Sequence, residues 1–213
     1  MQVIRGGQTL TAANGMSVDV GDRIKTGPGS GATITLSDGS TLELGESGEL
    51  TLDQHTINPN GAATTQSSLF SGVVRSVVAH LASGPVGNFE VHTPNAVASA
   101  RGTVYDVDYI QGVGRDQYKD CFQFSDVSVF EGTVQVTNPS NPNGSVDVAA
   151  GHKAVVPCGL VPVVIGAAVI GGISGTTAAA AGGVAGVGGV VGGLAGAGAF
   201  GGGGSKHSAT PMQ

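Results

Sequence analysis

The sequence predicts an all-β protein: a compact β-solenoid-like or sandwich-like domain of about ten to twelve short strands, followed by a glycine-rich apolar tail. Three observations lead to this prediction. Apolar and polar residues alternate with a period of two in several segments, which is typical of strands with one buried face. Glycine-containing turn sequences separate these segments at short intervals. No segment shows a convincing helical pattern.

Composition divides the chain of 213 residues into parts. No charged side chain occurs between Lys153 and Lys206, and nearly all the charge lies before this stretch. We therefore expect an all-β domain over residues 1–156, an apolar association or membrane segment over 157–204, and a polar C-terminal end over 205–213. The net charge of −6 at pH 7 argues against nucleic-acid binding, which needs a basic surface.

The most regular alternation lies in residues 33–52, where the large apolar residues all fall on even positions. A two-residue loop would put them on opposite faces of a hairpin. A three-residue loop at residues 37–39 pairs Ile34 with Leu42 instead, so that all of them face one way, and Gly39 is free to take a positive φ. The even-numbered residues are Ile34, Leu36, Leu42, Leu44, Leu50 and Leu52.

The same stretch holds four carboxylates, which raises the possibility of a calcium or acid–base site. A calcium loop needs several oxygens that converge on one ion, with a spacing such as D-x-[DN]-x-[DN]-G. The acids here are spread over separate strands and turns without that spacing. We expect turn and solvated-face roles for all four, which are Asp38, Glu43, Glu46 and Glu49.

The remaining β elements follow from the same rules. Residues 8–25 predict short strands joined by turns, and Gly27 belongs to the next turn. Residues 53–68 are polar without periodicity and predict a loop. Residues 69–78, 89–94 and 144–156 predict further strands. Residues 126–136 predict a second hairpin, in which a two-residue turn at Glu131-Gly132 pairs Val129 with Val134 and Val127 with Val136.

Residues 103–110 predict a strand with Tyr105, Val107 and Tyr109 on one face. Asp106 and Asp108 share the other face and form the most site-like feature of the chain. No histidine or third acid lies at a useful spacing from them. A solvated strand face is therefore the favoured interpretation of the aspartate pair.

Catalytic and cofactor motifs are missing from the sequence. The five histidines are scattered, no G-x-S-x-G motif occurs, and the segment GPGSGA lacks the lysine of a phosphate-binding loop. We predict no enzymatic activity, no metal and no cofactor.

The chain has two cysteines, Cys121 and Cys158. Without a C-x-x-C motif they do not make a zinc site. A disulfide and two unpaired thiols both remain open, because spacing alone cannot establish pairing. Residues 1–15 lack the apolar run of a signal peptide, so a mature form, another export route and retention in the cell are all compatible with the sequence.

The order of the motifs resembles the FecR-domain family. The shared features are a G-D-x-[IL]-x-T-G opening, a DGS turn, an L-x-x-G-x-V segment, V-x-T-P followed by R-G-T-x-[FY]-x-V, an EG turn and a closing A-G. The resemblance covers about residues 8–156. The corresponding residues are Gly21-Asp22, Thr26-Gly27, Asp38-Gly39-Ser40, Leu69 to Val73, Val91 to Pro94, Arg101-Gly102-Thr103 with Tyr105, Glu131-Gly132, and Ala150-Gly151.

This resemblance implies an all-β domain of the bacterial cell envelope, periplasmic or surface-exposed, without catalysis. Family regulators relay the state of an outer-membrane transporter to an anti-sigma segment in the cytoplasm. Because neither a cytoplasmic helical segment nor an N-terminal membrane span precedes the domain here, we expect a stand-alone envelope protein. Arg101-Gly102-Thr103 is the natural ligand candidate. We interpret it first as structure, with Arg101 bonding backbone carbonyls and Gly102 permitting a tight bend.

The apolar tail contains repeated pairs of glycines spaced four apart, which let helices approach closely in a membrane. Membrane or cell-wall contact and packing between copies are favoured over a free linker. Two functions stay open: an envelope module that binds a protein or a glycan, and a subunit that self-assembles into a filament or multimer. The glycines involved are Gly171, Gly175, Gly182, Gly186, Gly188, Gly189, Gly192, Gly193 and Gly196.

Overall fold

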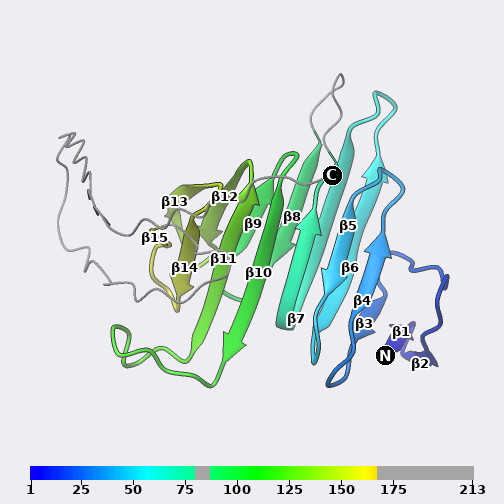
Figure 1. Ribbon diagram of the computed structural model, residues 1–213, viewed down its shortest axis with the longest axis horizontal. Helices are drawn as coiled ribbons and strands as arrows, with labels where there is room; N and C mark the ends of the chain where they lie inside the picture. Colours follow the sequence, from blue (N-terminus) through cyan, green and yellow to red (C-terminus); the bar gives the residue numbers. More distant parts are fainter. Residues whose placement is uncertain (80–86, 167–213) are drawn as a thin grey trace, which may run out of the picture. The chain divides into compact units, whose positions relative to one another are not determined.

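The computed structural model describes residues 1–79 and 87–166, and these contain 15 β-strands and no helix (Figure 1). The predicted all-β class is confirmed, and the strands outnumber the ten to twelve expected. Within these ranges, no segment could cross a membrane as an apolar helix. The tail glycines between residues 171 and 196 lie outside the described residues.

The strands are short except for the seventh. In chain order they are β1 (Gln2–Arg5), β2 (Gln8–Thr11), β3 (Arg23–Lys25), β4 (Ala32–Thr35), β5 (Thr41–Leu44), β6 (Glu49–Ile57), β7 (Ala63–Val77), β8 (Asn88–His92), β9 (Val97–Ala100), β10 (Val104–Gln111), β11 (Gln123–Glu131), β12 (Thr133–Asn138), β13 (Asn141–Ala149), β14 (Lys153–Pro157) and β15 (Val163–Ile165).

Strand β7 belongs to two layers. Its first part, up to Ser71, pairs with β6 and, in parallel, with β8. From Gly72 onward it pairs with β5 and β10. The first layer therefore runs β2-β1-β3-β6-β7-β8-β9-β12-β13, and the second runs β4-β5-β7-β10-β11-β14-β15.

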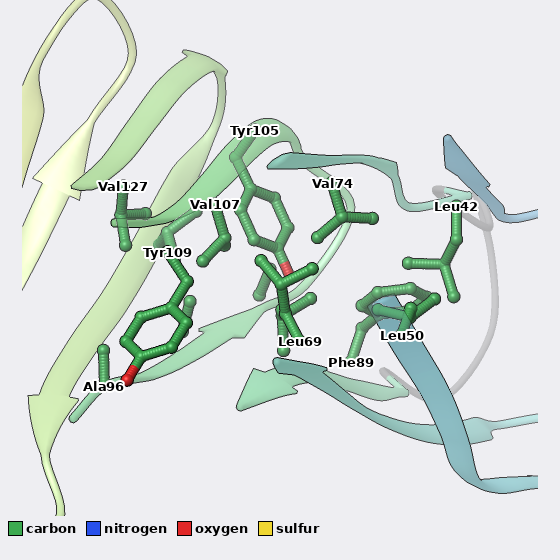
Figure 2. Close-up of a cluster of buried hydrophobic side chains, with 14 of the residues drawn as sticks. Leu42, Leu50, Leu69, Val74, Phe89, Ala96, Tyr105, Val107, Tyr109 and Val127 are labelled. Carbon is green, nitrogen blue, oxygen red and sulfur yellow. The ribbon is translucent and has the colours of Figure 1, made fainter. Parts of the chain in front are cut away.

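The hydrophobic core takes side chains from both layers. Leu50, Leu69 and Phe89 come from the first layer, and Leu42 and Tyr105 come from the second (Figure 2). All of them are at most 2% exposed. This arrangement agrees with the sandwich-like alternative of the predicted fold.

The hairpin predicted at residues 37–39 is confirmed. Ile34 pairs with Leu42, and the N–H of Leu36 donates to the carbonyl of Ser40 at 2.8 Å. Gly39 has a φ of 85°. The carboxylate of Asp38 accepts hydrogen bonds from the backbone N–H and the hydroxyl of Ser40, which is the predicted turn role.

The loop predicted over residues 53–68 is wrong. β6 continues to Ile57, and β7 starts at Ala63 after a short turn. The inward face of this part of β7 carries Thr65 and Ser67, which are at most 1% exposed. The buried face of this part of the strand carries hydroxyl residues instead of apolar ones. The alternation of buried and exposed positions is therefore not visible as an alternation of apolar and polar residues.

The hairpin predicted over residues 126–136 is also wrong. β11 lies in the second layer between β10 and β14, whereas β12 lies in the first layer between β9 and β13. Glu131-Gly132 is therefore a corner between layers, and Val134 pairs with Val148 and Ala100. A corner buries the same alternate residues as a hairpin, so the burial pattern cannot distinguish the two.

The folded region extends past residue 156. β15 pairs with β14, and Cys158 forms a disulfide with Cys121. At least residues 157–165, which the sequence assigned to the tail, therefore belong to the β-structure.

The hairpin geometry makes Gly39 sensitive to substitution. We expect Gly39→Val to lower the free energy of unfolding by about 1 kcal/mol or more, because a β-branched residue resists a positive φ. Gly27→Ala is the control, since Gly27 has no positive φ and an added Cβ would meet nothing within 4 Å. Urea denaturation measures both. Equal losses of stability would contradict the assigned turn.

Candidate functional site

The outer face of the second layer carries a row of charges across neighbouring strands. On β10, Asp106 lies opposite Arg75 of β7, which lies opposite Glu43 of β5. The guanidinium of Arg75 forms a two-pronged contact with Asp106, with Nε–Oδ1 at 2.8 Å and Nη2–Oδ2 at 2.9 Å. It also lies 4.9 Å from the ring centre of Phe130. Asp106 is thus part of a bidentate ion pair at the surface.

Two residues along β10, Asp108 lies directly opposite Asp126 of β11. The side chain of Asp126 is only 6% exposed. Its Oδ2 accepts from Arg115 at 2.8 Å and is also paired with Lys153. Its Oδ1 is buried without a hydrogen-bond partner among the described residues. The structure therefore brings a third aspartate, Asp126, to the predicted pair, together with two cations.

These surroundings raise the pKa of Asp108. Burial raises the pKa of its carboxyl above the ordinary value, and the negative charges of Asp126 and Asp106 act in the same direction. Lys153 and Arg115 lower the pKa but do not cancel the increase. Asp108 is consequently more easily protonated than an ordinary carboxyl in water.

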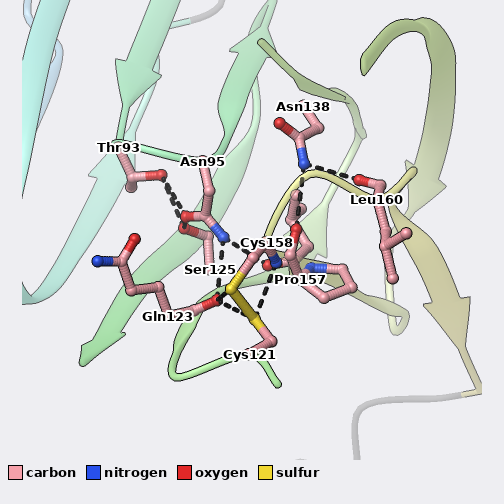
Figure 3. Close-up of a disulfide and its surroundings, with 10 residues drawn as sticks. Thr93, Asn95, Cys121, Gln123, Ser125, Asn138, Pro157, Cys158 and Leu160 are labelled. Carbon is pink, nitrogen blue, oxygen red and sulfur yellow. Dashed lines mark hydrogen bonds between the residues drawn. A yellow bond between two sulfur atoms is a disulfide. The ribbon is translucent and has the colours of Figure 1, made fainter. Parts of the chain in front are cut away.

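A loop between β10 and β11 covers part of this face. Arg115 in the loop lies 4.4 Å from the ring centre of Phe124, and the ring of Tyr118 lies 5.8 Å from it. The disulfide between Cys121 and Cys158 ties the end of the loop to the segment after β14 (Figure 3). The loop thereby positions Arg115 beside Asp126.

Next to the disulfide, a buried polar network connects the V-x-T-P segment to the second layer (Figure 3). The hydroxyls of Thr93 and Ser125 lie 2.7 Å apart, and Ser125 donates to Asn95 Oδ1 at 2.6 Å. The amide of Asn95 donates to the carbonyl of Val156 at 2.7 Å. The sequence did not reveal this role, because the partners lie 30 or more positions apart.

The Arg101-Gly102-Thr103 motif forms a corner with Gly132. Gly102 has a φ of 68°, which agrees with the predicted bend. Thr103 is buried, and a Cβ added at Gly132 would lie 2.7 Å from its Cγ2. The carbonyl-bonding role predicted for Arg101 is wrong: its side chain is exposed and makes no hydrogen bond to any described residue. The tight bend leaves Arg101 pointing to solvent.

The Gly21-Asp22 motif has a partner that sequence analysis missed. Asp22 is 1% exposed and accepts hydrogen bonds from Arg5 at 2.6 and 2.9 Å. These bonds lower the pKa of Asp22 against the opposing effect of burial. The pairing joins β1 to the turn that precedes β3.

Among residues 1–79 and 87–166, no three His, Cys, Asp or Glu side chains converge as a metal site would require. The carboxylates of the outer face are compensated by arginine and lysine instead.

The raised pKa of Asp108 predicts a pH-dependent stability. The folded protein holds this proton more tightly than the unfolded chain, so the charged form costs stability above the folded pKa and the cost disappears as pH falls through it. Asp108→Asn should stabilise the protein at pH 7, by less than about 1 kcal/mol because the group is partly exposed and screened. The gain should shrink toward pH 4.

Thermal unfolding of Asp108→Asn at pH 7, 5.5 and 4 tests this expectation. Asp106→Asn is the matched control on the same strand face, and it should destabilise at pH 7 because it breaks the Arg75 pair. A destabilising effect of Asp108→Asn at pH 7 would show that its charge is favourable in the folded state.

Comparisons with known proteins give a family and a fold. No match was found among proteins of curated function. Two crystal structures of a candidate anti-sigma factor from Parabacteroides distasonis, at 1.65 and 2.50 Å, resemble this chain with a TM-score of 0.50 and 16% identity. Each match covers 68% of this chain and 59% of the other. The FecR protein family matches residues 22–135, which is more than half of the sequence. The chain therefore belongs to the FecR family.

Proposed function

We propose that this chain is a non-catalytic FecR-like module of the bacterial cell envelope that acts by binding a protein partner. FecR membership and the fold shared with a candidate anti-sigma factor support a regulatory protein contact over glycan binding. The proposed regulatory contact includes a role in the control of a sigma factor.

One surface observation carries the proposal. Large apolar side chains are exposed around the disulfide, where Phe122 is 55% and Leu160 is 50% exposed. The bond between Cys121 and Cys158 holds their two segments together. Exposed large apolar side chains that gather near one another mark protein interaction sites. We call this set the disulfide patch; it comprises Phe122, Leu160, Val161, Val164 and Ile165.

The disulfide also supports the envelope location. Such bonds persist in oxidising compartments and are rare in the cytosol. Asn138 reinforces the patch, because its side-chain amide donates to the carbonyls of Pro157 and Leu160 at 3.1 and 2.7 Å. The patch is thus presented on an ordered support, as a recognition surface requires.

Site-specific photocrosslinking in the native cell tests the proposal. A photoreactive phenylalanine analogue at position 122 should form an adduct with one envelope protein, identified by mass spectrometry. Ile57, which is 48% exposed at the tip of the β6–β7 hairpin, is the control position. No adduct at 122, or the same adducts at both positions, would contradict the proposal.

Binding of the purified partner then gives the energetic test. We expect Phe122→Ser to weaken binding by about tenfold or more, as for an exposed aromatic at the centre of an interface. Ile57→Ser should leave affinity unchanged. A chromosomal neighbourhood containing a sigma factor and a transporter would identify the regulatory branch; other neighbours would favour a different envelope partner.

A further inference from the structure

The free edge of β4 presents a second surface, distant in the strand order from the disulfide patch. β4 is the end strand of the second layer and pairs only with β5. In an antiparallel pair, every second residue directs its backbone N–H and C=O toward the neighbouring strand. The N–H of Leu36 donates to Ser40, so the backbone groups of Ile34, two residues earlier, also point toward β5. The backbone groups of Thr33 and Thr35 therefore point outward, and no described residue bonds them.

This edge lacks the usual protection against pairing. Natural edge strands are blocked by charges, prolines or bulges. β13, at an edge of the first layer, carries Pro142 and Asp147. β4 has the sequence ATIT, with none of these features. The strand is therefore competent to accept another strand.

A groove with a mixed polar and apolar lining runs beside the same edge. One hollow of about 590 Å³ lies between Thr33 and Thr35 of the strand and the segment that carries Met16 and Val18. A second hollow of about 550 Å³ shares Met16, Val18 and Thr33 with the first, so the two form one groove. No Asp, Glu, Lys or Arg side chain lines either hollow. An extended segment without charged side chains can therefore add to β4 without leaving a charge unpaired in this groove.

The sequence after β15 matches these requirements. No charged residue occurs from position 154 to 205, and the stretch is rich in glycine, alanine and valine. Forty-seven residues follow Gly166, ample length for an added strand. We propose that the β4 groove receives an extended stretch of residues 167–204 from a second copy of the chain.

The strand directions explain why a second copy is favoured. All six neighbouring pairs of the second layer, from β4 to β15, are antiparallel. β4 and β15 therefore run in the same direction. A strand that follows β15 and reverses would be antiparallel both to β15 of its own copy and to β4 of the next. Such a strand would form hydrogen bonds with the backbones of two edge strands at once, whereas pairing with β4 of its own copy would use only one edge strand.

Such a contact joins two different edges, so repetition produces a head-to-tail chain of copies. The inference goes beyond the proposed partner binding, and its β4 variants leave every residue of the disulfide patch unchanged. Loss of the partner contact and loss of self-association can therefore be separated by variants on different surfaces.

The test compares two double variants of the full chain by light scattering after size-exclusion chromatography. Thr33→Lys with Thr35→Lys places charges along the β4 groove. Thr9→Lys with Thr11→Lys is the matched control, since both threonines are exposed on β2, an edge strand of the first layer. Circular dichroism verifies folding of each variant. We expect the wild type and the control to associate, and the β4 variant to associate about tenfold more weakly or to be monomeric.

Mixed-label crosslinking identifies the occupant. A photoreactive residue at position 35 in an unlabelled copy, mixed with ¹⁵N-labelled protein, should give peptides that join position 35 to labelled residues 167–204. A monomeric wild type, an unchanged size of the β4 variant, or crosslinks confined to one copy would overturn the proposal. Mixed-label crosslinks outside residues 167–204 would also overturn it.

Discussion

The double membership of β7 is the constraint on which the rest of the structure depends. One strand pairs with β6 and β8 before Gly72 and with β5 and β10 after it. The change of layer requires backbones to approach closely: a Cβ at Gly72 would lie 2.8 Å from the Cα of Gly48. Gly48 and Gly45 are equally confined, by Leu44 and Val73. Gly72, the glycine of the L-x-x-G-x-V motif, is thus the residue at which β7 passes from the first layer to the second.

Polar contacts then fix how the layers are joined at their ends. Asp22 draws Arg5 of β1 toward the segment before β3. At the other end, Thr93 and Asn95 connect the β8–β9 turn to Ser125 of β11. These groups are buried and hydrogen-bonded, so removing one partner leaves an unsatisfied group in a low-dielectric interior. Several motifs of the family therefore contribute to assembly of the sandwich.

Much of the fold could be predicted from the sequence where the buried face is apolar. The parity of Leu42 and Leu44 and the turn at Gly39 agree with the structure, as does the inward face of Tyr105, Val107 and Tyr109. Prediction failed where hydroxyl residues line the interior, as at Thr65 and Ser67. It also failed at Gly132, because a corner and a hairpin bury the same side of each strand.

The candidate site was predictable only in part, for a different reason. Asp106 and Asp108 share a strand, so their common face follows from the period of two. Asp126 joins them through β-pairing, and Arg115 reaches Asp126 only because a loop folds over the face. Contacts between residues on different strands depend on the strand order, which local patterns do not contain. Arg101 is likewise exposed because of the direction in which the chain turns at Gly102, which local patterns do not contain either.

The position of the disulfide has a mechanical consequence. Cys121 precedes β11 and Cys158 follows β14, at a sequence separation of 37, so the bond bypasses strands of both layers. A pull applied through the C-terminal segment would detach only β15 before it reached Cys158. From there the load would pass through the sulfur atoms to Cys121 and the β10–β11 loop, leaving β12 and β13 outside the line of force. An anchor at the tail could thus hold the module under tension without unravelling its last strands.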